Sequence, residues 1–168
     1  MNILISYQLH RYFSSRYQTI CRKIDCVTLK GSLEALSLYT IDLCIDNLPP
    51  SKNKEDIPKE ELCEINRMKK YGFLDGLENE VFLMEDVLDN DKSIKMLLKN
   101  FNIEFHEVFK KGLELYLEGK WQEAKVKLES ALILKPNDGP SKTIMKFMES
   151  NAFEKPENWK GFRELVEK

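Results

Sequence analysis

The chain has 168 residues, of which 42% are hydrophobic and 32% charged, and its formal net charge at pH 7 is −2. This composition is typical of a soluble globular protein, and it excludes a strongly basic surface that would attract nucleic acid or an anionic membrane through bulk charge. No segment reaches the roughly 20 consecutive apolar residues of a membrane span, so we expect none in this chain.

The four cysteines, Cys21, Cys26, Cys44 and Cys63, lack the spacing of a zinc site, because no two of them are separated by only two residues. The N-terminal sequence also lacks the basic region and the small-residue cleavage site of a secretory leader. We therefore expect free and mostly buried thiols in a reducing cytoplasm, without a disulfide framework.

The N-terminal third predicts a small α/β element. Residues 3–18 have apolar side chains at helical spacing, and "ILI" at their start is compatible with a short strand. Residues 20–29 and 35–43 alternate in polarity, are rich in strand formers and flank the turn signal "KGS" at residues 30–32. We expect a helix and an antiparallel hairpin. Because so small an element has little core, it should pack on the helical part, on another copy or on a partner.

The rest of the chain predicts helices. Residues 49–59 contain three prolines and many charges, which disfavours regular structure and indicates a linker. Helical periodicity then covers residues 60–72, which end at a glycine, and residues 77–89, and continues after a break that Asp91 or Ser93 can cap. The expected organisation is an α+β chain with an N-terminal element at 1–48, a linker at 49–59 and a helical domain at 60–168.

Residues 105–138 match the 34-residue pattern of a tetratricopeptide repeat. The pattern requires small residues where two helices cross, a large apolar residue between them and a proline that ends the second helix. Its fitting positions are Gly112, Ala124, Leu128, Ala131 and Pro136, with Gly119 at the turn. One repeat cannot bury its own apolar faces, so neighbouring helices are expected to complete a small domain.

The first helix of the repeat carries Phe109, Leu113 and Tyr116. In tetratricopeptide proteins this helix often lines a peptide groove, but Phe109 and Leu113 stand where a carboxylate-binding clamp needs lysine and asparagine. Two interpretations follow. These side chains bind an apolar peptide or helix of a partner, or they pack in the core against the preceding helix.

We find no self-sufficient catalytic or metal site in the sequence. The seven glycines are scattered and form no phosphate-binding loop. His10 and His106 have no metal ligands at useful spacing and are expected on helix surfaces.

The segment "ILISYQLHRYFSSRYQTICRKIDCVTLKGSLEALSLYTIDL", residues 3–43, resembles the end of a class III nucleotide cyclase catalytic domain. Together with the repeat and the ending "NWKGFRELVEK", it is similar to the C-terminus of large adenylate/guanylate cyclases of ciliates and other protists. The resemblance implies that the two metal-binding aspartates, their Mg²⁺ or Mn²⁺ ions and the base-reading residues lie upstream of this segment. It also implies that Lys30, in the "KG" turn, reaches toward the nucleotide triphosphate.

The resemblance favours a C-terminal protein-interaction and regulatory region of a cyclase-like protein that is not catalytic by itself and needs no cofactor. We expect it to bind a protein partner through the helical domain, either a cyclase domain or a large assembly. We expect it to bind no nucleic acid. One alternative is a part of a longer enzyme that makes cAMP or cGMP with two divalent metal ions. Another is a structural adaptor in a large assembly, with the cytoplasm or the cilium as its location.

Overall fold

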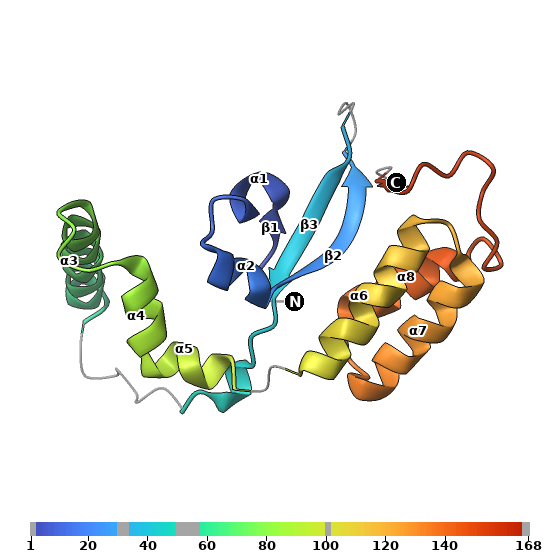
Figure 1. Cartoon of the computed structure of the whole chain (residues 1–168). Helices are drawn as coiled ribbons and strands as arrows, with labels where there is room; N and C mark the ends of the chain where they lie inside the picture. The colour runs from blue at the N-terminus through green and yellow to red at the C-terminus, as the bar shows by residue number, and fades with distance from the viewer. Residues whose placement is uncertain (1–2, 30–33, 50–57, 100–101, 166–168) are drawn as a thin grey trace. The chain divides into compact units, whose positions relative to one another are not determined.

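The computed structural model describes residues 3–29, 34–49, 58–99 and 102–165, and it is a mixed α+β structure (Figure 1). The chain divides into two compact units. Unit 1 joins Met1–Asp42 to Phe101–Lys168, and unit 2 is Leu43–Asn100. This division differs from the expected one. The N-terminal element was expected to be a domain of its own, whereas it forms one unit with the C-terminal helices. Each unit is described by itself below.

Unit 1 contains a four-stranded sheet with the order β1-β3-β2-β4. The strands are β1 (Ile5–Ser6), β2 (Cys21–Thr28), β3 (Leu36–Ile41) and β4 (Arg163–Glu164). The β2–β3 pair is the antiparallel hairpin expected from the alternating sequence, and β1 also pairs antiparallel with β3. The short β4 comes from the end of the chain and pairs parallel with β2.

A β-bulge in β2 controls which side chains this strand buries. The register against β3 shifts between Lys23 and Asp25, so Ile24 is an extra residue in the strand. A bulge of one residue reverses the alternation of side chains. As a result Arg22 and Ile24 are buried before the shift and Asp25 and Val27 after it. The bulge thus places Asp25 on the same buried side as Arg22, which precedes it.

The expected N-terminal helix is two short helices, α1 (Tyr7–His10) and α2 (Ser15–Ile20). The Ser6 side chain caps α1 by accepting a hydrogen bond from the Leu9 amide. The break between the helices is closed by Gln18, whose side-chain amide donates to the Phe13 carbonyl over 2.9 Å. In Figure 1, α1 and α2 lie on the opposite side of the β2–β3 pair from the C-terminal helices.

The C-terminal helices of unit 1 are α6 (Ile103–Leu117), α7 (Trp121–Leu134) and α8 (Gly139–Glu149). The close helix crossing expected at Gly112 is present, because a Cβ atom at this position would lie 3.0 Å from the Leu128 side chain. Gly119 has a φ of 82°, which allows the tight turn between α6 and α7. The main core of unit 1 lies between these helices and consists of Phe105, Phe109, Leu113, Leu115, Tyr116, Trp121, Ala124, Leu128, Ala131, Ile144 and Met148.

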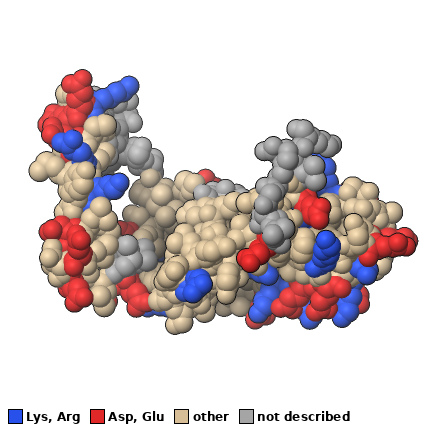
Figure 2. Space-filling model, turned by 90° about the horizontal axis from the view of Figure 1, so that it is seen from above, with Lys and Arg blue, Asp and Glu red and all other residues tan. Residues whose placement is uncertain are grey.

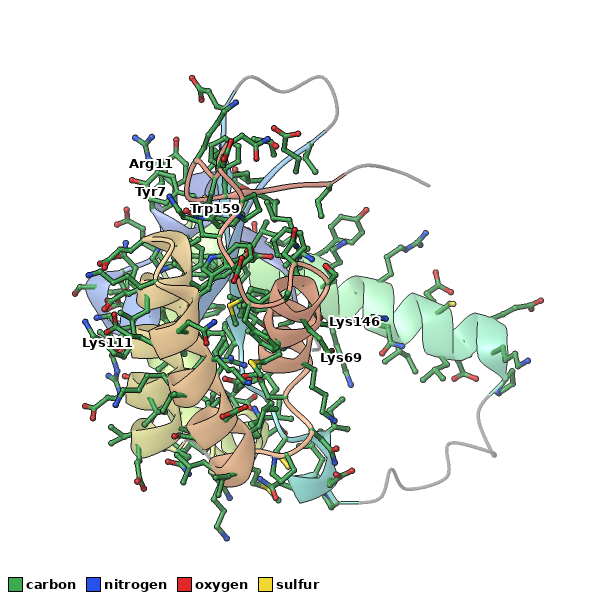
Figure 3. All side chains as sticks on the ribbon, turned by 90° about the vertical axis from the view of Figure 1, so that its right-hand side faces the viewer. Tyr7, Arg11, Lys69, Lys111, Lys146 and Trp159 are labelled. Carbon is green, nitrogen blue, oxygen red and sulfur yellow. The ribbon has the colours of Figure 1, made fainter. Side chains whose placement is uncertain are left out.

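The C-terminal segment, residues 150–165, returns from α8 across the α6–α7 turn to the sheet. Trp159 (labelled in Figure 3) donates its indole N–H to the Leu117 carbonyl over 3.1 Å. The ring centroid of Trp159 is 5.1 Å from those of Tyr116 and Trp121. The segment therefore covers aromatic side chains that a further repeat would cover in a longer array.

Unit 2 contains η1 (Ile45–Asn47), α3 (Lys59–Glu78), α4 (Met84–Asn90) and α5 (Lys92–Leu97). The prediction that a helix ends at Gly72 is wrong, because α3 continues to Glu78. Gly72 sits on an open side of α3, where a Cβ atom would meet nothing within 4 Å, so its only disadvantage is its low helix propensity. The expected cap at Asp91 is present, since its carboxylate accepts from the Ser93 and Ile94 amides at 2.7 and 3.0 Å.

The four cysteines are free, as expected, but they are less buried than expected. Cys21, Cys26 and Cys44 are half-buried and Cys63 is exposed. Among the described helices, none has the length and apolar character to cross a membrane.

Candidate functional site: a charged clasp and an open apolar surface

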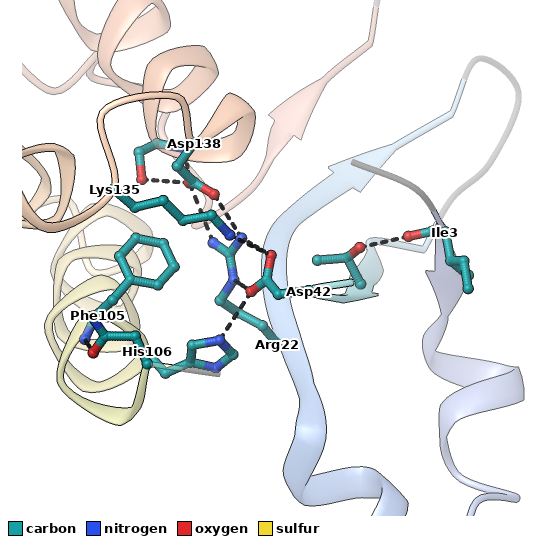
Figure 4. Close-up of polar contacts among 10 residues, drawn as sticks. Ile3, Arg22, Asp42, Phe105, His106, Lys135 and Asp138 are labelled. Atoms are coloured by element: carbon teal, nitrogen blue, oxygen red, sulfur yellow. Dashed lines mark hydrogen bonds and ion pairs between the residues drawn. The ribbon is translucent and has the colours of Figure 1, made fainter. Parts of the chain in front are cut away.

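Arg22 joins the hairpin to the helices through two carboxylates (Figure 4). Its Nε and one terminal nitrogen donate to the Asp42 carboxylate at 2.7 and 3.0 Å. The terminal nitrogens also donate to the Asp138 carboxylate at 2.7 and 3.3 Å. The Arg22 side chain is only 3% exposed, and the planar guanidinium is suited to such paired contacts. We call Arg22, Asp42, His106, Lys135 and Asp138 the Arg22 clasp.

Asp138 serves the clasp and the helix that follows it. It is the N-cap of α8, and its Oδ2 accepts from the Ser141 amide at 2.9 Å and from the Ser141 hydroxyl at 2.6 Å. A carboxylate at a helix N-terminus satisfies free backbone N–H groups and interacts favourably with the helix dipole. The residue that starts α8 therefore also holds Arg22 of the sheet.

Asp42 receives two further contacts from the repeat. His106 Nε2 lies 2.9 Å from its Oδ2, and Lys135 Nζ donates to its Oδ1 over 2.9 Å. Burial by itself would raise the pKa of Asp42, but the hydrogen bonds from His106, Arg22 and Lys135 together hold it well below its usual value of 3.8. Asp42 is thus a carboxylate that stays charged because α6, β2 and the residue that follows α7 all donate to it.

Two aromatic rings form the floor of the clasp. The Arg22 guanidinium carbon lies 4.4 Å from the Phe109 ring centroid and 4.9 Å from that of Phe105, and Lys135 Nζ lies 5.0 Å from the latter. These distances are those of cation–π contacts, which are stronger where water is excluded. The clasp therefore combines ion pairs with a buried apolar surface.

The residues predicted to bind a partner lie in the core. Phe109, Leu113 and Tyr116 are all buried. Phe109 packs under Arg22, and Tyr116 packs against Trp121 and Trp159. These side chains are therefore buried, as the core interpretation expected, but the contacts are with β2, α7 and the C-terminal segment and not those with the preceding helix that this interpretation named.

The other predicted site residues fall in different places. Lys30 lies outside the described residues. His106 was expected on a helix surface, and the structure corrects this, because its ring is mostly enclosed and belongs to the Arg22 clasp. His10 stacks on Tyr39 with ring centroids 4.0 Å apart. Within the described ranges, no group of three histidine, cysteine or acidic side chains is arranged to hold a metal ion.

Unit 1 also has an open apolar surface at its N-terminal end. Five large apolar side chains within ten residues are between 42% and 79% exposed, namely Ile3, Leu4, Tyr7, Leu9 and Tyr12. We call these five residues the N-terminal apolar surface. Figure 2 shows few charged side chains over this region, and Figure 3 labels Tyr7 with the neighbouring Arg11. No acidic residue occurs before Asp25, and the guanidinium carbon of Arg11 lies 5.5 Å from the Tyr12 ring centroid.

Comparison with protein-family models, with curated proteins and with solved structures finds no match to this chain. The function must therefore be argued from the residues and contacts described above.

Proposed function

We propose that this chain is the C-terminal interaction and regulatory region of a class III nucleotide cyclase-like protein, and that it acts by binding a protein and not by catalysis. Support comes from the order of elements between residues 3 and 43, which is a strand, two short helices and two strands, where the resemblance implies a strand, one helix and two strands. The Arg22 clasp adds a second argument, because it makes the helical repeat a fixed extension of that hairpin.

The observation that carries the proposal is the N-terminal apolar surface. Soluble proteins rarely leave several large apolar side chains exposed side by side, and such clusters indicate contact sites for proteins. On the opposite side of the strands, the helices and the Arg22 clasp cover part of the sheet, and a pocket lined by Leu4, Ile24 and Ile144 remains beside α8. The open side therefore suits an apolar protein surface with acidic residues at its rim, which would complement Arg11 and Arg16.

The partner that we propose for this surface is a class III cyclase catalytic core, as the resemblance suggests. A cyclase catalytic core lies before the segment that residues 3–43 resemble, so its natural place is against the first elements of unit 1. The Arg22 clasp would connect such a core to the helical repeat without a flexible joint. In this arrangement the repeat regulates the core by fixing the position of the hairpin.

The experiment titrates the purified chain with a recombinant class III cyclase catalytic core in isothermal calorimetry. We expect the double variant Leu9→Asp/Tyr12→Asp to bind at least about tenfold more weakly, because it places two charges in an apolar contact. The matched control is Ile133→Asp on α7, which changes a side chain that is 80% exposed and lies outside the N-terminal apolar surface. Absence of binding by the unaltered chain, or equal weakening by both variants, would overturn the proposal.

The enzymatic alternative is distinguished by turnover. We expect the purified chain to form no cyclic nucleotide from ATP or GTP in the presence of Mn²⁺, since the resemblance places the metal-binding aspartates upstream. Cyclic nucleotide formation by the chain alone would contradict its non-catalytic assignment. Binding to other components without any binding to a cyclase core would favour the adaptor alternative.

A further inference from the structure

The C-terminal segment packs Trp159 against three helices of unit 1. The centroid of the Trp159 ring lies 5.1 Å from those of the Tyr116 and Trp121 rings and 6.1 Å from that of the Phe147 ring. These three rings belong to α6, α7 and α8 respectively. Trp159 therefore completes an aromatic cluster to which each of the three helices contributes one ring.

The backbone at the end of α6 also fits this segment. Leu117 is the last residue of α6, and its carbonyl accepts the indole N–H of Trp159. The last carbonyls of a helix have no partner within the helix, so this contact satisfies one of them. Gly161 has a φ of 84° and lies against the same carbonyl, where a Cβ atom would be 3.2 Å from the oxygen. The helices thus form a site that fits a tryptophan followed two residues later by a glycine.

A second set of contacts joins the segment to the sheet. β4 pairs parallel with the end of β2, and the Leu165 amide donates to the Thr28 carbonyl over 3.1 Å. Arg163 also donates to the Asp25 carboxylate over 2.6 Å. All these contacts come from Trp159 and the residues after it. The part of the segment that is recognised is therefore distinct from the connection that joins it to α8.

This connection has a strained turn. Ala152 and Phe153 have φ angles of 53° and 58°, which is the left-handed region that residues other than glycine rarely adopt. The Phe153 amide donates to the Met148 carbonyl over 2.8 Å, so the two residues reverse the chain at the end of α8, where glycine is usual. A chain that left α8 in an extended conformation would release the strain at both residues.

We propose that two copies of this chain form a dimer by exchanging their C-terminal segments, so that Trp159 of each protomer completes the aromatic cluster of the other. The partner is a second copy because the site fits this segment and every copy carries it. When extended, residues 151–158 can span about 26 Å, which allows Trp159 to reach a neighbouring molecule. This inference depends only on contacts within unit 1 and not on the proposed cyclase relationship.

The free energy of exchange has two opposing parts. The exchanged form keeps every contact of Trp159 and β4 and loses the strained turn at Ala152 and Phe153, and strain in such a connection favours exchange. Joining two chains costs translational and rotational entropy. We therefore expect monomers in dilute solution and dimers at high concentration, with an equilibrium that depends on the conformation of Ala152.

The test measures the monomer–dimer equilibrium of the full chain by analytical ultracentrifugation, with two substitutions of the exposed Ala152. Ala152→Gly relaxes the closed turn and should raise the dimer dissociation constant about tenfold or more, because each dimer contains two such connections. Ala152→Val should lower it, since a β-branched residue adopts a positive φ with more difficulty. A chain that stays monomeric at its highest soluble concentration, or equal dissociation constants in all three proteins, would overturn the proposal.

Isotope-filtered NMR of a mixed-label dimer distinguishes exchange from other association. In a sample of labelled and unlabelled chains, we expect nuclear Overhauser effects between the Trp159 ring of one chain and the Tyr116 ring of the other. Leu9→Asp changes the N-terminal apolar surface and should leave the dimer dissociation constant unchanged. A dimer without these intermolecular effects, or one that Leu9→Asp abolishes, would show that the chains associate through another surface and would refute the exchange.

Discussion

Arg22 in β2 and Asp138 at the start of α8 are separated by 116 residues in the sequence and form a buried ion pair with a shortest N–O distance of 2.7 Å. Both side chains are at most 3% exposed. Removal of one partner from a buried ion pair leaves an uncompensated charge in the interior and is strongly unfavourable. The two hydrogen bonds of this pair therefore hold the hairpin to the helices.

Arg22→Met should lower the free energy of unfolding of unit 1 by about 3 kcal/mol, because Asp138 loses its buried counter-ion. Both tryptophans of the chain, Trp121 and Trp159, lie in unit 1, so their fluorescence in a urea titration reports this unit alone. Lys111→Met is the control, since Lys111 forms an exposed pair with Glu114 and should change the stability by less than about 0.5 kcal/mol. Similar effects of both substitutions would refute a special role for Arg22.

The Arg22 clasp also makes unit 1 sensitive to acid through Asp42. Because the pKa of Asp42 is lower in the folded chain than its usual 3.8, its stabilising contribution is fully present above that pH and is lost as the pH falls below it. The stability difference between the unaltered chain and Asp42→Asn should therefore shrink on acidification. The measurement is a series of urea titrations between neutral pH and about pH 3.

Asp25→Asn is the control, because the effect of this substitution on stability should change with pH in the opposite direction. Burial raises the pKa of Asp25 in the folded chain, so its contribution is greatest at low pH and decreases as the pH rises. The unaltered chain should thus gain stability relative to Asp25→Asn on acidification. The same direction for both variants would show that the pH dependence does not arise from these two carboxylates.

The helix pair could be predicted from the sequence because its signals are local. Gly112, Gly119 and Pro136 occur at spacings that fit two helices and a tight turn, and the structure has α6 and α7 at these places. The β2–β3 hairpin was predictable for the same reason, from alternation on both sides of a turn signal. Periodicity and turn residues report on neighbours in the chain, so they identify such elements reliably.

The Arg22 clasp could not be predicted in this way. Arg22 occurs in an alternating strand, where a polar residue is normally assigned to the solvent side. Arg22 is buried because α6 packs against β2, a contact between segments far apart in the sequence. His106 was expected on a surface because its partner, Asp42, lies in a distant part of the sequence. The signal that could have indicated the clasp is the coincidence of acidic residues at a strand end and a helix cap.

Two glycines with opposite surroundings test the packing of the helices. Gly112→Ala should destabilise α6 and α7 by about 1 kcal/mol, because its Cβ would approach the fully buried Leu128 within 3.0 Å and overpacking outweighs the gain in helix propensity. Gly72→Ala should stabilise α3 by up to about 1 kcal/mol, since nothing lies near its Cβ position. Amide hydrogen exchange measures each helix locally, and stabilisation by Gly112→Ala would show that Leu128 can yield.

Substitutions of Tyr116 test whether the first repeat helix packs its side chains in the core or presents them in a peptide groove. Its hydroxyl is buried and has no hydrogen-bond partner among the described residues, so Tyr116→Phe should leave the stability unchanged or raise it by up to about 1 kcal/mol. Tyr116→Ala should cost about 3 to 5 kcal/mol, because the ring packs against Trp121 and Trp159. Thermal unfolding followed by tryptophan fluorescence distinguishes the two. Unchanged thermal unfolding of Tyr116→Ala together with weaker binding to a protein partner would contradict the core interpretation. It would show that the Tyr116 side chain contacts the partner in a groove.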